Sequence, residues 1–426
     1  LKLKKMVMRG WSMPHKLSEI ISWPEQREKA KTYFDSYGWP DNRNEAWKYT
    51  SLAHLKEGKF TASSDNAPID SAPIDSTQVI DSAAQLEGFY VEISGSAVQL
   101  PPQDALPNGI SITDITADDN ARAAAFTHLA DNHLLPALSA MHQTSAIAID
   151  IEKTDSAAPL PAVILNLTGS NKEGACYPFV IVRVHKGAEA RIAEIHSSHA
   201  GLSCPLMVYE VADDAKLQHI RLQAEASHTT HLGLNQMQMG KNSQINSFAI
   251  SMGGALSRLE THSLFLGSDA ELAQSAIYLG RDRQHHDITS FVAHEIRDCA
   301  SRQLIRGVLD DKARGVFQGK VRVAPDAQKT DGQQMSRALL LSRDAEADAK
   351  PELEIFADDV VCSHGATVGE LDENLMFYLK SRGIAEEDAR NMLIDAFLVD
   401  TLDEIEDPDF AAFMTSQINR WSLARR

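Results

Sequence analysis

The chain has 426 residues, of which 43% are hydrophobic and 23% are charged, as in globular proteins with a large buried core. Its 59 acidic and 41 basic residues give a net charge of -18, so the chain as a whole is expected to repel nucleic acid and anionic membranes. No segment approaches the roughly 20 consecutive apolar residues that a membrane-spanning helix needs, so no membrane association is expected.

The first region, residues 1–145, is predicted to be mainly helical. Its first helix is expected to end near Gly38, because glycine favours the conformation that closes a helix. A polar, proline-containing segment at 63–78 predicts a linker or an exposed loop. Residues 116–144 predict further helix, with a kink or a break at Pro136.

The second region, residues 146–368, is predicted to consist of short strands, because apolar residues alternate with a period of two. The strand starts recur after Gly or Asp turns at Ala190, Ala215, Ser243 and Ala270, with spacings of 25, 28 and 27 residues. A β-sandwich would show turns every 8–12 residues without this longer repeat. The pattern therefore favours a β-solenoid, in which each repeat forms one turn.

The third region, residues 369–426, returns to a helical period. Leu375 and Leu379 share one face of a short predicted helix, and Met392, Leu393 and Phe397 form a stripe on the next one. Such a stripe usually packs on its own domain. A solenoid end must also be capped or paired, so these five side chains are candidates for binding a partner protein.

Several weaker motifs give little support to other functions. The four cysteines are far apart without a Cys-x-x-Cys pair, which disfavours a zinc ribbon and fits a cytoplasmic protein. The segment 283–296 contains three histidines, which could bind a metal but are more often ordinary strand residues. A carbohydrate-active β-helix enzyme is the alternative from another class, although only 6% of the residues are aromatic and could stack on sugars.

Cys362 and His364 lie two residues apart in a predicted strand near the end of the second region. Residues i and i+2 of a strand point to the same face, so the two side chains should project together while Ser363 points away. A thiolate and a neutral imidazole are suitable ligands for iron or a nascent iron–sulfur cluster. From spacing alone, two ordinary strand residues are the better explanation of the pattern.

The chain resembles the SufB/SufD family of iron–sulfur cluster assembly proteins, most closely its SufD branch. The similarity is dense over residues 298–400, which contain "RGVLDDKARGVFQGKVRVAPDAQKTDGQQMSRALLLS" and "ADDVVCSHGATVGELDEN". Residues 43–52, "RNEAWKYTSL", resemble an N-terminal signature of the SufD branch. The sequence Cys-Ser-His-Gly at residues 362–365 also resembles that of the SufD branch.

The resemblance implies a right-handed parallel β-helix flanked by helical terminal regions. It implies a scaffold subunit, not an enzyme, which forms a heterodimer with SufB while the partner ATPase SufC hydrolyses ATP. A homodimer is a further assembly to expect when SufB is absent. No tightly bound cofactor is expected in the isolated chain, only transient iron or an iron–sulfur cluster shared with SufB. His364 occupies the position of the family histidine implicated in cluster assembly, whereas the roles of ligand and of packing both remain open for Cys362.

Overall fold

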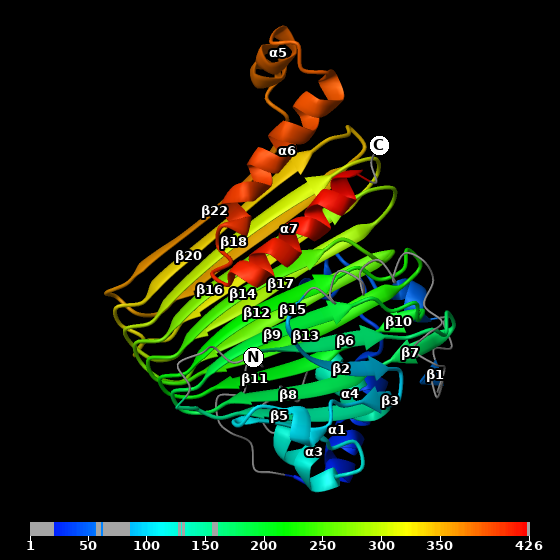
Figure 1. The fold of residues 1–426 in the computed structure, drawn as a ribbon, viewed down its shortest axis with the longest axis vertical. Coiled ribbons are helices and arrows are strands. Elements are labelled where there is room, and N and C mark those ends of the chain that lie inside the picture. The colour runs from blue at the N-terminus through cyan, green and yellow to red at the C-terminus, as the bar shows by residue number, and fades with distance from the viewer. Residues whose placement is uncertain are drawn as a thin grey trace, which may run out of the picture.

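The computed structural model describes residues 21–56, 61–62, 86–126, 129, 133–155 and 161–423, and it is built around two large sheets (Figure 1). From β11 to β22 successive strands of the chain alternate between the sheets, and nearly all neighbours within a sheet are parallel. The architecture is therefore the predicted parallel β-helix, flanked by helices at both ends of the chain. None of the described helices combines the length and the apolar character needed to cross a membrane.

The strands of the two sheets have the following bounds. The twelve-stranded sheet contains β1 (Thr61–Ala62), β4 (Ile110–Asp114), β5 (Ser145–Ile151), β7 (Gly174–Cys176), β8 (Pro178–Val184), β10 (Leu202–Ser203), β11 (Leu206–Val211), β13 (Thr230–Met239), β15 (Leu256–Phe265), β17 (His285–His294), β19 (Arg314–Val323) and β21 (Glu346–Ile355). The ten-stranded sheet contains β2 (Gly88–Ser94), β3 (Ala97–Gln99), β6 (Ala162–Thr168), β9 (Glu189–His196), β12 (Lys216–Gln223), β14 (Gln244–Ser251), β16 (Glu271–Gly280), β18 (Ala300–Leu309), β20 (Asp331–Leu340) and β22 (Val361–Glu370).

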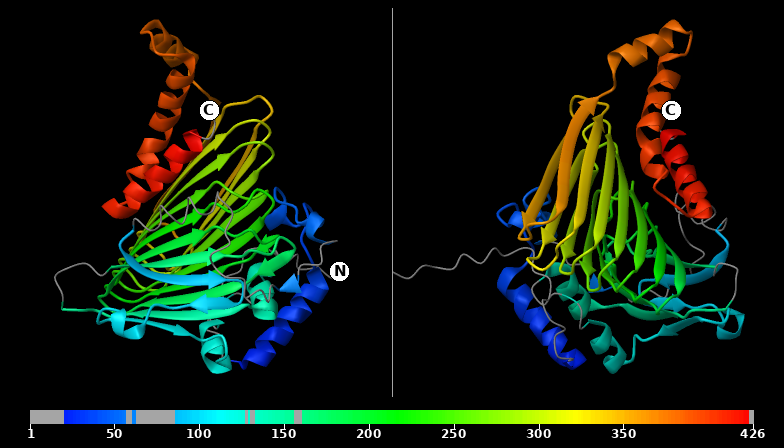
Figure 2. Two further views of the ribbon diagram at one scale, coloured as in Figure 1. Left: turned by 45° about the vertical axis from the view of Figure 1, so that its right-hand side comes forward. Right: turned by 90° about the vertical axis from the view of Figure 1, so that its left-hand side faces the viewer.

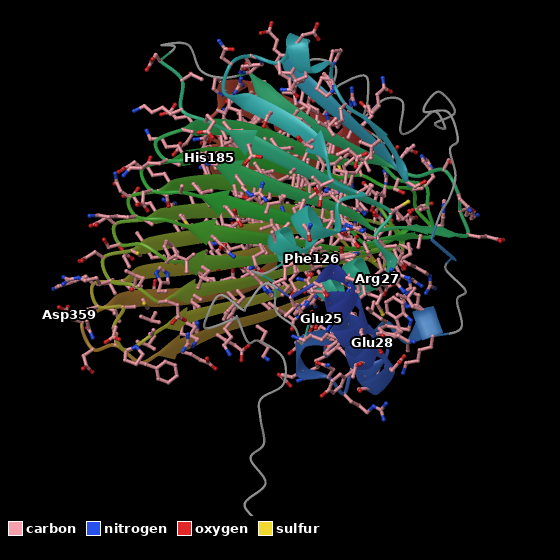
Figure 3. The ribbon with its side chains drawn as sticks, turned by 90° about the horizontal axis from the view of Figure 1, so that it is seen from below. Glu25, Arg27, Glu28, Phe126, His185 and Asp359 are labelled. Carbon is pink, nitrogen blue, oxygen red and sulfur yellow. The ribbon has the colours of Figure 1, made fainter. Side chains whose placement is uncertain are left out.

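A repeated tight turn explains the sequence period. Before each of six consecutive strands of the ten-stranded sheet, one residue has a positive φ: Gly187, Asp214, Asn242, Asp269, Asp298 and Lys329. Gly, Asn and Asp tolerate this conformation best, and only Lys329 departs from them. The next residue is always almost fully buried: Ala188, Ala215, Ser243, Ala270, Cys299 and Thr330. Asp359 lies at the same corner, at the edge of the stack of turns, and its carbonyl accepts the Lys329 N–H at 2.7 Å (Figure 3).

The strand register corrects one predicted spacing. Glu189 pairs with Lys216, so this turn of the solenoid has 27 residues instead of the 25 inferred from Ala190. The true equivalent of Ala215 is Ala188, because both follow a residue with positive φ. The error arose because Ala190 also begins an alternating apolar pattern. The other two predicted spacings, 28 and 27, agree with the register.

The N-terminal elements cover the outer face of the twelve-stranded sheet over its first turns (Figures 1 and 3). Phe126 links them to the sheet, since its ring centroid lies 4.9 Å from Trp23 and 4.6 Å from Phe179. Pro136 lies in a helical first turn, where its missing N–H costs no helical hydrogen bond. The predicted linker at 63–78 lies outside the described residues. The elements are α1 (Trp23–Tyr37), α3 (Asp119–Phe126), α4 (Leu134–His142) and the short 3-10 helices Glu45–Trp47, Ala53–Lys56 and Gln103–Ala105.

The C-terminal helices are α5 (Glu373–Ser381), α6 (Glu386–Leu402) and α7 (Pro408–Leu423). α6 and α7 pack against the outer face of the ten-stranded sheet through an apolar cluster that includes Ile394 and Leu398. α5 follows β22 and stands beyond the last turn of the solenoid, away from both sheets (Figure 2). The N-terminal and C-terminal elements thus cover opposite faces of the β-helix.

Candidate metal site at the open end of the β-helix

The last strand of each sheet leaves one end of the β-helix open. β21 pairs with β19, β22 pairs with β20, and each is the terminal strand of its sheet. Large apolar side chains lie exposed there, notably Val361, which is 67% exposed, and Val368. An exposed apolar strand edge is a ready surface for pairing with another chain.

Cys362 and His364 lie on β22 and face the interior side of the solenoid. The register places them opposite Gly332 and Gln334 of β20, whereas Ser363 between them belongs to the opposite face. A Cβ at Gly332 would lie 3.3 Å from Cys362 Sγ, so the glycine leaves room for the thiol. The structure therefore brings the two predicted ligands to one face of an edge strand.

The two side chains differ in their surroundings. Cys362 is half-buried and packs against the apolar core of the solenoid. Burial raises the pKa of its thiol, so the thiolate needed for metal binding is disfavoured until a cation is present. His364 is exposed. A partner could therefore reach the imidazole freely, whereas the thiol is already in contact with its own domain.

A row of polar side chains extends from His364 into the interior of the solenoid. Gln334 is the register neighbour of His364, and it is followed by Gln303 and Gln274 on the next two strands. Gln334 Nε2 donates to Gln303 Oε1 at 2.6 Å. Its carbonyl oxygen is buried without a hydrogen-bond partner. This free acceptor could orient the His364 ring by accepting a ring N–H, as outer partners of metal-bound histidines commonly do.

The backbone of β22 presents hydrogen-bonding groups to the outside. The Val361 N–H donates to Thr330 O at 2.9 Å, within its own sheet. Alternate residues of a parallel strand direct their backbone groups to opposite neighbours. The N–H and C=O groups of Cys362, His364 and Ala366 therefore face away from β20, on the free edge.

The five predicted partner-binding side chains have unequal exposure. Leu375 and Met392 are 50% and 49% exposed, whereas Leu379 and Leu393 are half-buried. Phe397 packs against the apolar cluster beneath α6, and its ring centroid lies 4.8 Å from the Arg306 guanidinium. Leu375 and Met392 thus remain available to a partner, and Phe397 is in contact with its own sheet.

The histidine-rich segment 283–296 does not converge on a metal site. His285 and His286 are consecutive on β17, so their rings lie on opposite faces of the sheet. His285 Nε2 lies 3.0 Å from Thr50 Oγ1, and His286 Nδ1 lies 2.8 Å from Ser251 Oγ. Each histidine has its own partner, as ordinary strand residues do.

The segment 43–52 has a structural role that sequence reasoning missed. Trp47 stacks on the fully buried Arg258, with 4.1 Å between guanidinium and ring centroid, and Arg258 Nη1 donates to Ala46 O at 3.0 Å. Arg258 also pairs with Glu260 at 2.9 Å and with Asp287 at 2.8 Å. This buried network fixes the N-terminal region to the twelve-stranded sheet.

The comparisons with known proteins agree with this geometry. Residues 166–397 match the family described as SUF system FeS cluster assembly, SufBD core domain. The chain is 30% identical over 380 residues to the iron–sulfur cluster assembly protein SufD of Escherichia coli, covering 87% of this chain and 86% of that protein. It is 29% identical over 411 residues to a SufBD family protein of Synechocystis, covering 89% and 87%. It is 26% identical over 385 residues to a SufBD family protein of Mycobacterium leprae, covering 88% of each chain.

The fold is thus a parallel β-helix whose last strand carries a cysteine and a histidine on one face of an unpaired edge. The chain belongs to the SufB/SufD family of the SUF system and is most similar to SufD.

Proposed function

We propose that this chain is a SufD-like scaffold subunit of a SufBCD complex, in which it supplies part of the iron–sulfur cluster assembly site and assists iron entry. The observation that carries the proposal is the placement of Cys362 and His364 on the same face of an unpaired edge strand. Iron and cluster are cargo here. Two ligands cannot complete a cluster site, so the partner chain and free sulfide supply the rest.

His364 is the ligand from this chain. His364 is the register neighbour of Gln334, whose buried carbonyl oxygen has no partner, and this supports a ring orientation with one nitrogen held and the other free for iron. Cys362 has a raised thiol pKa and contacts the core, which supports a secondary role. The thiol would ligate only when iron displaces its proton.

SufB is the partner that covers the open edge. The outward backbone groups of β22 support pairing with a strand of SufB, and the exposed Val361 and Val368 add apolar surface to that interface. A second copy of this chain could occupy the same edge when SufB is absent. Both assemblies would place a partner chain directly beside His364.

The ATPase SufC docks on α5 and the adjoining part of α6. α5 stands away from both sheets, and Leu375, Phe377 and Met392 are all about half exposed or more. Apolar residues at helical spacing are suited to a groove on a partner protein. ATP hydrolysis takes place in SufC, and this chain transmits its motion to the solenoid through α6.

The test is to purify the complex of SufB and SufC with this chain carrying His364→Ala, and to measure bound iron, bound sulfide and ATP hydrolysis. We expect a normally assembled complex with normal ATP hydrolysis and much less iron and sulfide, since truncating one exposed side chain costs at most about 1 kcal/mol of stability. Ser363→Ala is the matched control, because Ser363 faces the other way on the same strand. Wild-type iron and cluster yield in the His364→Ala complex would remove the histidine from the site.

A further inference from the structure

A second cluster of metal-binding side chains lies inside the solenoid, in turns far from β22. It consists of His196 at the end of β9, Glu225 in the loop after β12 and His231 on β13. All three are buried, with exposures of 0%, 4% and 0%, and their donor atoms lie within 4.8 Å of one another. We propose that these three side chains form a binding site for one divalent transition-metal ion, Fe²⁺ or Zn²⁺.

His196 is already oriented as a metal ligand. Its Nε2 lies 3.0 Å from Glu194 Oε2. A carboxylate oxygen accepts hydrogen bonds, so at this contact Nε2 carries the ring proton and donates it to Glu194, and Nδ1 keeps its lone pair. Nδ1 is buried and has no hydrogen-bond partner. A carboxylate holding the far side of an imidazole is the usual arrangement around a metal-bound histidine.

Glu225 and His231 complete the set. His231 Nδ1 lies 2.8 Å from Glu225 Oε2, while Glu225 Oε1 is buried without a hydrogen-bond partner. His196 Nδ1 and Glu225 Oε1 are therefore two buried donor atoms without partners in the same cluster. Metal–ligand bonds of about 2.0–2.2 Å require only a small inward closure of donors that are spaced like these.

The charge balance favours a cation. Glu194 and Glu225 are two buried carboxylates, and Arg221 is the one cationic side chain that pairs with them among the described residues, with its Nε 3.4 Å from Glu194. One guanidinium thus lies beside two buried carboxylates, and a buried carboxylate is stabilised by a bound cation. Binding through Nδ1 of His231 would displace Arg221 from His231 Nε2, where it now lies at 3.0 Å. Arg221 Nε and Nη1 have no hydrogen-bond partners and could then turn fully to Glu194.

The ligand set selects the class of metal. Two imidazole nitrogens and one carboxylate oxygen suit Zn²⁺ or Fe²⁺, whereas Mg²⁺ and Ca²⁺ prefer oxygen ligands alone. The neighbouring cluster of His133, Glu260 and His262 is a weaker candidate, because both histidine Nε2 atoms already lie 2.8 Å from the same carboxylate oxygen.

The first test uses the full chain without a polyhistidine tag, unfolded with chelator and refolded anaerobically with Fe²⁺, Zn²⁺ or Co²⁺. We expect about one tightly held equivalent per chain, a higher melting temperature with the metal present and, for Co²⁺, the visible absorption of a bound ion. Less than a tenth of an equivalent, with no change in melting temperature, would overturn the proposal.

Variants then locate the metal. His196→Gln and Glu225→Gln should each weaken binding at least tenfold, and Glu194→Gln should do so by about 10–100-fold through the orientation of His196. His294→Gln is the control, because His294 is equally buried and has an unpartnered Nδ1 but no acid of the cluster beside it. His364→Ala should keep the metal, which separates this site from the proposed cluster site. Equal loss in the His294→Gln protein, or full retention in His196→Gln, would contradict the assignment.

Discussion

The early turns of the solenoid and its last turn differ in how their strands are covered. Every residue of β13 is buried, because the N-terminal elements lie over its outer face and the interior is filled. No residue of β22 is fully buried, although it belongs to the same kind of turn. The terminal regions therefore cover strands of the earlier turns, as far as β20 in the ten-stranded sheet, and leave the last edge free. The free edge of the last turn is therefore where the proposed pairing with a partner strand should be tested.

Breaking the buried network of the covered half should have the largest effect. Arg258→Met leaves Glu260 and Asp287 buried without their cation, so we expect a loss of about 3–5 kcal/mol in the free energy of unfolding, measured in urea. Arg314→Met is the control, since Arg314 is partly exposed and pairs with Asp348 near the open end. It should cost less than about 1 kcal/mol. Equal losses of stability in the two variants would show that ion pairs in the covered turns and near the open end contribute equally to folding.

Prolines on the open edge should separate partner binding from folding. Ala366→Pro removes an outward N–H and should weaken SufB binding by about 10–100-fold, which corresponds to about 1–3 kcal/mol, while the chain stays folded. Val361→Pro instead breaks the inward bond to Thr330 O and should lower the stability of the isolated chain. Sedimentation of the complexes and thermal unfolding of the isolated chains measure the two effects. Unchanged SufB affinity in Ala366→Pro would argue against edge pairing.

A charge on the projecting helices should affect SufC more than SufB. Met392→Asp should weaken SufC binding by about 1–2 kcal/mol, measured by calorimetry, because the side chain is half exposed and does not hold α6 on its sheet. Phe397→Asp is a poorer test, since Phe397 packs on the chain's own apolar cluster. SufC affinity equal to that of the wild type in folded Met392→Asp would exclude this part of α6 from the docking surface.

The smallest expected effect concerns thiol reactivity. Cys362 is the one cysteine that is not buried, so iodoacetamide should label it first in the native protein. Burial raises the pKa of its thiol, so the thiolate fraction is low at neutral pH and the labelling rate should keep rising above pH 9. Peptide mass spectrometry at several pH values gives the rate. Rapid labelling at pH 7 would show a thiolate that the structure does not account for.

Local periodicity explains how much of the fold was predictable. Most strands between β5 and β16 were recognised because one face of each is apolar and the period is two, but β7, β10 and β13 were not. The same-face placement of Cys362 and His364 followed from strand geometry alone. The start of the repeat at Ala190 was wrong because positive φ at Gly187, which marks the turn, cannot be distinguished from an ordinary loop glycine in a single sequence.

The features that sequence reasoning missed depend on contacts between distant segments. Charged strand residues such as Arg258 and Asp287 suggest exposure, yet both are buried under residues 43–52. Their spacing of 29 residues, close to one turn of the solenoid, was the available signal. The stripe on α6 was ambiguous for a similar reason, since Ile394 and Leu398 contact the sheet while Met392 does not. A helical wheel shows which residues share a face of the helix, but it cannot show which apolar face packs against the β-helix.

The most direct test of the central claim is to label the histidines of this chain alone with ¹⁵N, assemble it with unlabelled SufB and SufC, load the complex with iron and sulfide, and record the pulsed electron paramagnetic resonance spectrum of the reduced cluster. If His364 binds the cluster at the open edge, a ¹⁵N coupling from one imidazole will appear and will be absent from the His364→Ala complex, and the interior site at His196 will not contribute to it. A loaded wild-type complex without any ¹⁵N coupling would contradict the claim that this chain supplies a ligand.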